Sequence, residues 1–172
     1  MTDTCARTTQ RLEIAFRHIA QARMAGMAVT HASLIVQAMG FRSWNGDCLG
    51  VLITPWAMNL VCLPGGECPW AVSPIGTLIE MELPSGNYEF LTAREETLGP
   101  YLSSSLFSPM FGFKDMEQAR QVALAVLEEV FTPQARMAAS ASIPASALDR
   151  MLDRPISRRA FLGACLGRGR QP

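Results

Sequence analysis

The chain has 172 residues, of which 49% are hydrophobic and 17% are charged, so it can bury one core and has little charge with which to cover its surface. Its formal net charge of zero hides two unequal parts: residues 1–131 carry 8 Lys and Arg against 13 Asp and Glu, a net of −5, whereas residues 132–172 carry 7 Arg against 2 Asp, a net of +5. Because an acidic body repels phosphate, we expect no nucleic-acid partner.

The five cysteines form no Cys-x-x-Cys pair, so the sequence predicts neither a disulfide framework nor a zinc site. Cys62 and Cys68 flank a Pro-Gly-Gly turn that would allow a metal clip, but two soft ligands without a nearby histidine favour simple thiols. We therefore expect no metal and no cofactor. No apolar run suits an integral membrane segment, and Asp3 and Glu13 do not suit a signal peptide, which predicts a cytoplasmic protein.

The predicted fold class is α+β: a mostly antiparallel sheet of five to six strands flanked by an N-terminal and a C-terminal helix. Apolar side chains recur at helical spacing over residues 3–27. Strands are predicted over residues 34–41, 48–54, 58–63, 77–83, 88–92 and 101–105. A second helix begins after the capping residue Asp115 and runs to Phe131. Residues 1–131 form one predicted domain, and the Ala/Ser/Arg-rich residues 132–172 form a predicted disordered tail.

Two segments predict tight hairpins. Asn45-Gly46 favours the positive φ angles of a two-residue turn, and residues 84–87 combine Pro and Gly in a second reversal. In the strand before this second turn, alternation places Leu78, Glu80 and Glu82 on one face. We expect that face to be acidic and solvated.

The sequence contains no recognisable catalytic arrangement. His18 and His31 are the only histidines, and neither has a carboxylate or a cysteine beside it. The serines at 103–105 lack the glycine-flanked elbow of a nucleophile, and the glycines do not form a phosphate-binding loop. We therefore expect a protein that is not an enzyme.

Residues 50–61 allow two interpretations. In the first, two core strands meet at Pro55 and Trp56 is a large buried side chain. In the second, Pro55 interrupts the sheet, so that Trp56 presents its ring and its indole N–H to a bound peptide.

The segments GVLITPWAMNLVCLPG (50–65), LPSGNYEF (83–90) and LGPYLSSSLFSPM (98–110) occur in an order and spacing that resemble the HybE/HupJ family of nickel-iron hydrogenase assembly chaperones. The similarity spans residues 8–131. Ser104 stands where many members have cysteine, so we assign no thiol chemistry to the third segment.

The resemblance implies a cytoplasmic chaperone that binds the hydrogenase small-subunit precursor and its twin-arginine signal peptide before export, with other maturation proteins as further partners. The alternative is a non-catalytic scaffold that joins maturation proteins without reading the signal peptide. The expected peptide contacts are Trp56, Asn59, Tyr88, Leu106, Phe107, Ser108, Met110 and Phe111, and the expected partners for arginine are Glu80, Glu82 and Glu89. Because Tyr88 and Glu89 point to opposite faces of a regular strand, only one of them can line a single groove.

Residues 157–162 of the tail read Ser-Arg-Arg-Ala-Phe-Leu, which is similar to the S-R-R-x-F-L pattern of twin-arginine signals. Their position near the C-terminus does not suit export, and short arginine-rich matches also arise by chance in basic tails. The alternative to a chance match is that Arg158, Arg159, Phe161 and Leu162 form an internal signal mimic, which occupies the binding site until the client displaces it.

Overall fold

The computed structural model describes residues 2–66 and 68–133. Its elements are, in chain order, α1 (Thr2–Ala22), β1 (Gln37–Trp44), β2 (Asp47–Ile53), β3 (Met58–Leu63), the 3-10 helix η1 (Pro69–Val72), β4 (Leu78–Leu83), β5 (Gly86–Glu95), β6 (Gly99–Phe107) and α2 (Met116–Phe131).

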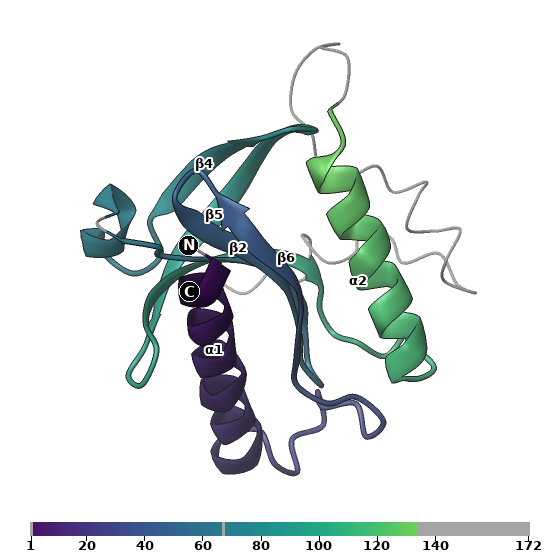
Figure 1. The fold of residues 1–172 in the computed structure, drawn as a ribbon. Coiled ribbons are helices and arrows are strands. Elements are labelled where there is room, and N and C mark those ends of the chain that lie inside the picture. Colours follow the sequence, from purple (N-terminus) through teal and green to yellow (C-terminus); the bar gives the residue numbers. More distant parts are fainter. Residues whose placement is uncertain (1, 67, 134–172) are drawn as a thin grey trace, which may run out of the picture.

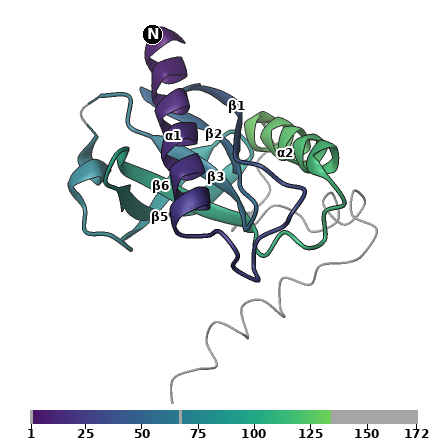
Figure 2. The ribbon, with the colours of Figure 1, turned by 90° about the horizontal axis from the view of Figure 1, so that it is seen from below.

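The strands form one antiparallel sheet in the order β1-β2-β3-β6-β5-β4. Helix α2 lies against one face of the sheet, as Figure 1 shows, and α1 crosses the other face (Figure 2). This arrangement confirms the predicted α+β fold with a helix from each end of the chain.

Helix α1 packs on one half of the second face of the sheet, the half formed by β1, β2 and β3. Leu12 and Phe16 of the helix are buried against Leu52, Val61 and Leu63 of the sheet. The helix also extends toward the β5–β6 turn, where Arg11 donates to the backbone carbonyl of Thr97 and Arg23, directly after the helix, pairs with the carboxylate of Glu95. The rest of β4 and β5 on this face is left uncovered.

A disulfide joins α1 to β2. Cys5 and Cys48 are 43 positions apart in sequence, and their Cα atoms are 5.6 Å apart, within the range that a disulfide requires. The expectation that no disulfide follows from the sequence is wrong at this pair, because helix packing brings together cysteines whose spacing gives no signal.

Helix α2 has the bounds that its sequence predicts. The carboxylate of Asp115 accepts a hydrogen bond from the backbone N–H of Gln118 at 2.9 Å, which caps the first turn. One stripe of the helix is buried on the sheet, and it contains Ala119, Val122, Ala123, Val126, Leu127 and Val130.

The first predicted hairpin is confirmed, and it corrects the bounds of β1. Asn45 and Gly46 have φ angles of 47° and 90°, so they form the two-residue turn and make Trp44 the partner of Asp47. Strand β1 therefore runs to Trp44 and begins at Gln37, three residues later at each end than the predicted 34–41.

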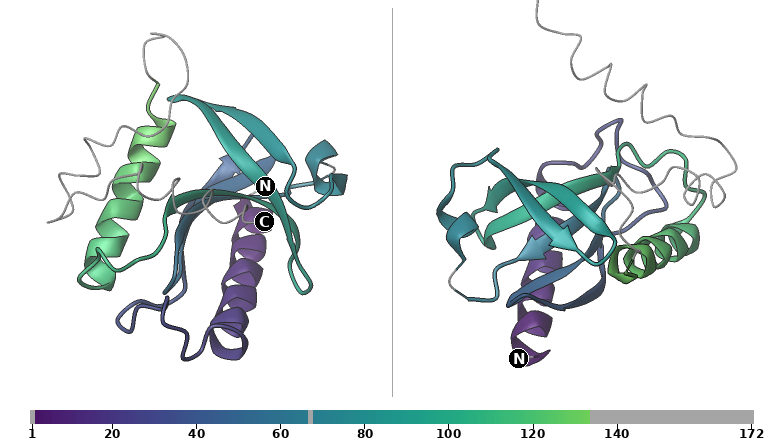
Figure 3. Two further views of the ribbon diagram at one scale, coloured as in Figure 1. Left: turned by 180° about the vertical axis from the view of Figure 1, so that it is seen from behind. Right: turned by 90° about the horizontal axis from the view of Figure 1, so that it is seen from above.

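The hairpin of β4 and β5 turns at Pro84-Ser85 and closes onto the end of α2 (Figure 3). The backbone N–H and the hydroxyl of Ser85 both donate to the Val130 carbonyl, at 3.3 and 3.1 Å. Since the serine proton is used there, the Tyr88 hydroxyl donates to the Ser85 oxygen at 2.8 Å. Burial raises the pKa of Tyr88, although its bond to Ser85 opposes this shift. This network holds one face of the hairpin against α2.

We predict that Tyr88→Phe lowers the free energy of unfolding by about 1 kcal/mol, because a buried hydrogen bond to Ser85 is lost while the ring stays in place. Tyr101→Phe is the matched control, since no group among the described residues forms a hydrogen bond with its half-buried hydroxyl. Urea unfolding of both variants measures the effect. Equal losses in the two variants would contradict the role of the network.

Candidate functional site

Trp56 lies in the turn between β2 and β3. The buried hydroxyl of Thr54 accepts from the backbone N–H of Ala57 at 2.9 Å and donates to the carbonyl of the same residue at 2.8 Å, which fixes the turn. The Trp56 ring is half-buried against the α1 side of the sheet, and Asn59 is half-buried on the same face. Trp56 is therefore neither the fully buried core residue of one interpretation nor the fully presented indole of the other.

The segment after β6 is part of the core. Phe107 and Met110 are 8% and 0% exposed, and the ring of Phe107 packs edge-on against that of Phe113 with centroids 5.2 Å apart. The prediction that Phe107 and Met110 present apolar surface is wrong, because this segment fills the core between the sheet and α2. Leu106 and Ser108 are half-buried, whereas Phe111 is 58% exposed.

The outer face of the β4–β5 hairpin collects the three predicted arginine partners. Glu80, Glu82 and Glu89 are all exposed on the face that points away from α2, and Glu80 is the register partner of Glu89. Tyr88 points the other way and is buried, so its prediction as a peptide contact is wrong. Its neighbour Glu89 is therefore the one of the two that can line an open surface.

Two leucines adjoin these carboxylates. Leu78 and Leu91 are register partners on the same face and are 56% and 50% exposed. We call Leu78, Glu80, Glu82, Glu89 and Leu91 together the hairpin face. Large apolar side chains that remain exposed together often mark a place where a partner binds.

The segment that leads into β4 extends this apolar region. Val72 and Ile75 are 86% and 70% exposed, and the backbone N–H of the following Gly76 bonds the carbonyl of Thr92 on β5. Leu91, Val72 and Ile75 are not among the residues that the sequence predicts for a binding surface. The predicted turn at residues 84–87 would have placed Leu91 opposite Glu80, whereas the observed two-residue turn at Pro84-Ser85 places it opposite Leu78. Exposure in a loop carries no sequence signal of its own.

The carboxylates of the hairpin face have no cation of their own. Residues 74–93 contain no Lys or Arg, and within the described part of the chain none of the three glutamates forms an ion pair. Glu80 accepts a hydrogen bond from the side-chain amide of Asn87 at 2.5 Å. Because like charges directly opposite each other on a sheet repel, a positive group between Glu80 and Glu89 would be stabilised.

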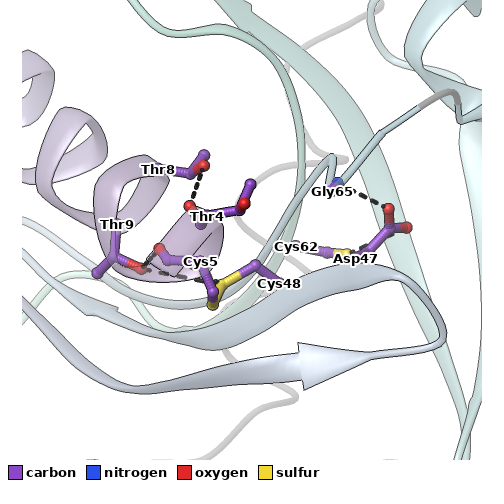
Figure 4. Close-up of a disulfide and its surroundings, with 8 residues drawn as sticks. All are labelled: Thr4, Cys5, Thr8, Thr9, Asp47, Cys48, Cys62 and Gly65. Carbon is purple, nitrogen blue, oxygen red and sulfur yellow. Dashed lines mark hydrogen bonds between the residues drawn. A yellow bond between two sulfur atoms is a disulfide. The ribbon is translucent and has the colours of Figure 1, made fainter. Parts of the chain in front are cut away.

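A second polar cluster surrounds Asp47 at the start of β2. Its carboxylate accepts hydrogen bonds from the Cys68 thiol at 2.7 Å, the Trp70 indole at 3.1 Å and the Gly65 backbone at 3.1 Å. Figure 4 shows this carboxylate with Gly65 and Cys62. Burial, and then the negative charge of Asp47, raise the pKa of Cys62, whereas burial and the hydrogen bond that its thiol donates to Asp47 raise the pKa of Cys68. Both thiols are therefore held protonated, which suits structural cysteines and not nucleophiles.

A small cavity opens beside the disulfide, between α1 and the β1–β2 turn. Its volume is about 70 Å³, far below the roughly 300 Å³ at which small-molecule sites begin. No group of His, Cys, Asp or Glu within residues 2–66 and 68–133 is arranged to hold a metal ion. In the same residues, no helix combines the length and apolar character needed to cross a bilayer. The hairpin face is thus the strongest candidate for a functional surface.

Comparison with known proteins points to hydrogenase maturation. Residues 7–164 match the family described as NiFe-hydrogenase assembly chaperone, HybE. The hydrogenase expression/formation protein HupJ of Bradyrhizobium diazoefficiens is 37% identical over 152 residues, which cover 88% of this chain and 84% of that protein. The hydrogenase expression/formation protein HoxT of Azotobacter vinelandii is 36% identical over 150 residues, covering 87% and 90%.

Two further similarities have a narrower meaning. The Probable rubredoxin HupJ of Rhodobacter capsulatus is 39% identical over 121 residues, but this chain spans only 44% of that protein. The solution structure of HybE from Escherichia coli superimposes with a TM-score of 0.59 at 24% identity, covering 80% of this chain and 88% of that one. The second similarity shows a shared fold.

The Asp47 cluster makes a prediction about thiol reactivity. At pH 8, Cys62 and Cys68 should react with a maleimide more slowly in the native protein than in guanidinium, because a pKa raised above 9 leaves little thiolate. Asp47→Asn should accelerate labelling of Cys68 by at least about threefold, since it removes the negative charge that opposes the thiolate. Mass spectrometry of labelled peptides separates the two sites, and Asp115→Asn serves as control. Unchanged labelling in Asp47→Asn would show that the carboxylate does not control these thiols.

Proposed function

Because this chain belongs to the HybE family of NiFe-hydrogenase assembly chaperones, we propose that it binds the precursor of the hydrogenase small subunit through the twin-arginine signal peptide, before that subunit is exported. The proposal assigns the hairpin face as the surface that meets the signal. It also assigns the protein to the cytoplasm, where the precursor is made, and gives it no catalytic step.

One observation carries this proposal: an exposed acidic group and an exposed apolar pair share one face of the β4–β5 hairpin, and no cation among residues 2–66 and 68–133 forms an ion pair with these glutamates. Glu80 and Glu89 form one register pair, and Leu78 and Leu91 form the next pair on the same face. A twin-arginine signal has a basic head followed by a moderately apolar stretch. The surface and the peptide therefore match in charge and in the order of their polar and apolar parts.

The chemistry of recognition follows from the side chains. A guanidinium group offers parallel N–H donors to a carboxylate, and such a bond is stronger than one between neutral groups. A peptide arginine between Glu80 and Glu89 would relieve the repulsion between these two carboxylates. An apolar side chain of the peptide would then cover Leu78 and Leu91, which adds affinity without requiring a deep groove.

The alternative is that the protein joins maturation proteins without reading the signal. A pull-down with small subunit that lacks its signal peptide separates the two functions, because the scaffold retains this partner and the signal-binding chaperone loses it. The half-buried Trp56 and the exposed Phe111 lie outside the hairpin face as we define it. Their role as peptide contacts stays a prediction that the hairpin face does not require.

The first prediction of this proposal concerns the carboxylates. Glu80→Gln/Glu89→Gln should weaken binding of a synthetic twin-arginine signal peptide about fivefold at low salt, because each of the two exposed charge pairs contributes roughly 0.5 kcal/mol. The loss should shrink as salt is added. Isothermal titration calorimetry gives the affinity.

The matched control is Glu117→Gln/Glu128→Gln, which removes two exposed carboxylates from α2. This control should bind the peptide like the unchanged protein. If both double variants weaken binding equally, overall negative charge attracts the peptide and the hairpin face has no special role.

A second prediction concerns the C-terminal segment, which we propose to be a tail separate from the domain formed by residues 1–131. Its residues Arg158, Arg159, Phe161 and Leu162 lie outside the described residues. If they compete for the hairpin face, deletion of residues 150–172 should tighten binding of the synthetic signal peptide in calorimetry. Unchanged or weaker affinity would rule out an internal mimic and leave the assignment of the hairpin face intact.

A further inference from the structure

Strand β4 is an edge strand whose outer side is open. The sheet order places it at one end, and β5 is its only partner strand within the described residues. Among the described residues, no backbone hydrogen bond reaches β4 from its other side. An open edge presents unpaired N–H and C=O groups, to which a further extended chain can bond.

The register shows which backbone groups point outward. Leu83 and Gly86 flank the two-residue turn and exchange hydrogen bonds, and bonded pairs alternate with non-bonded pairs along an antiparallel ladder. The N–H and C=O groups of Ile79 and Met81 therefore point toward β5. Those of Leu78, Glu80 and Glu82 point outward, and the side chains of these same residues are exposed on the hairpin face.

The opposite edge of the sheet is protected in three ways. The backbone N–H of Ala38 on β1 donates to the carboxylate of Glu13 on α1 at 2.8 Å, so its outward group is already used. The β1 ladder is broken by a register shift between Met39 and Arg42, where Gly40 has a φ of 59°. The side chain of the neighbouring Gln37 is bonded to Arg120 of α2. Strand β4 shows none of these devices in the described part of the chain.

The charges on β4 select what can pair with it. A second copy of β4 would bring Glu80 and Glu82 against the same residues, and like charges opposite each other disfavour such pairing. An arginine-bearing strand would instead place a positive charge beside each carboxylate. The edge is therefore open to a basic segment and closed to a second copy of itself.

We propose that an extended, arginine-containing segment of the client adds to β4 as a seventh, antiparallel strand. This inference rests on the proposed function and specifies how the signal is read. In an antiparallel strand, an arginine and the residue two positions after it lie on one face, opposite Glu80 and Leu78 in turn. The preferred segment therefore carries a large apolar side chain two residues after an arginine, as in the S-R-R-x-F-L pattern.

Peptide N-methylation tests this mode of binding. When the second arginine of a synthetic Ser-Arg-Arg-Ala-Phe-Leu peptide lies opposite Glu80, its N–H and that of the phenylalanine point at β4, whereas those of the alanine and the leucine point away. Methylating the backbone nitrogens of the second arginine and the phenylalanine should weaken binding to the full chain by about tenfold or more, because each lost backbone bond also leaves a methyl group in its place. Methylating the backbone nitrogens of the alanine and the leucine should change affinity by less than about threefold.

The protein supplies a second readout. Binding of the unmodified peptide should slow amide hydrogen exchange at Leu78, Glu80 and Glu82, and should leave Ile79 and Met81 unchanged because their amides are already bonded to β5. If the peptide binds but both methylated forms bind equally and no β4 amide slows, strand addition is wrong while the proposed function stands. If the unmodified peptide does not bind at all, both are overturned.

Discussion

The attachment of the β4–β5 hairpin to α2 determines which surface this protein offers. Ser85 bonds the Val130 carbonyl of α2 and is itself bonded by the Tyr88 hydroxyl, and Tyr88 and Phe90 are buried in the core on the same side. Because side chains alternate along a strand, burial of that face forces Glu80, Glu89 and their neighbours to the opposite face. Helix α1 is engaged with β1, β2 and β3, and it leaves this opposite face open. One buried network thus orients an acidic and apolar surface toward solvent.

Much of the fold could be predicted from local signals. Asp115 gave the start of α2, and Asn45-Gly46 gave the first hairpin, because capping and positive φ angles depend on adjacent residues. The prediction of a groove at Phe107 and Met110 is wrong, since a run of large apolar residues in a loop is compatible with burial in the core as well as with a binding surface. Only the packing under α2 distinguishes these cases, and it depends on residues far away in sequence.

The cysteines show a similar division. Cys62 and Cys68 are thiols, as predicted, and Asp47 holds both of them protonated. The Cys5–Cys48 disulfide depended on a contact between α1 and β2 that sequence spacing does not reveal.

The account depends most on the claim that the client signal lies on the hairpin face, and photocrosslinking tests it directly. A benzophenone side chain is placed at Leu91 or at Leu124 of α2, which are exposed by 50% and 53%, and the protein is irradiated with the twin-arginine signal peptide. The account predicts a crosslink from position 91 and none from position 124. A crosslink from position 124 without one from position 91 would contradict it.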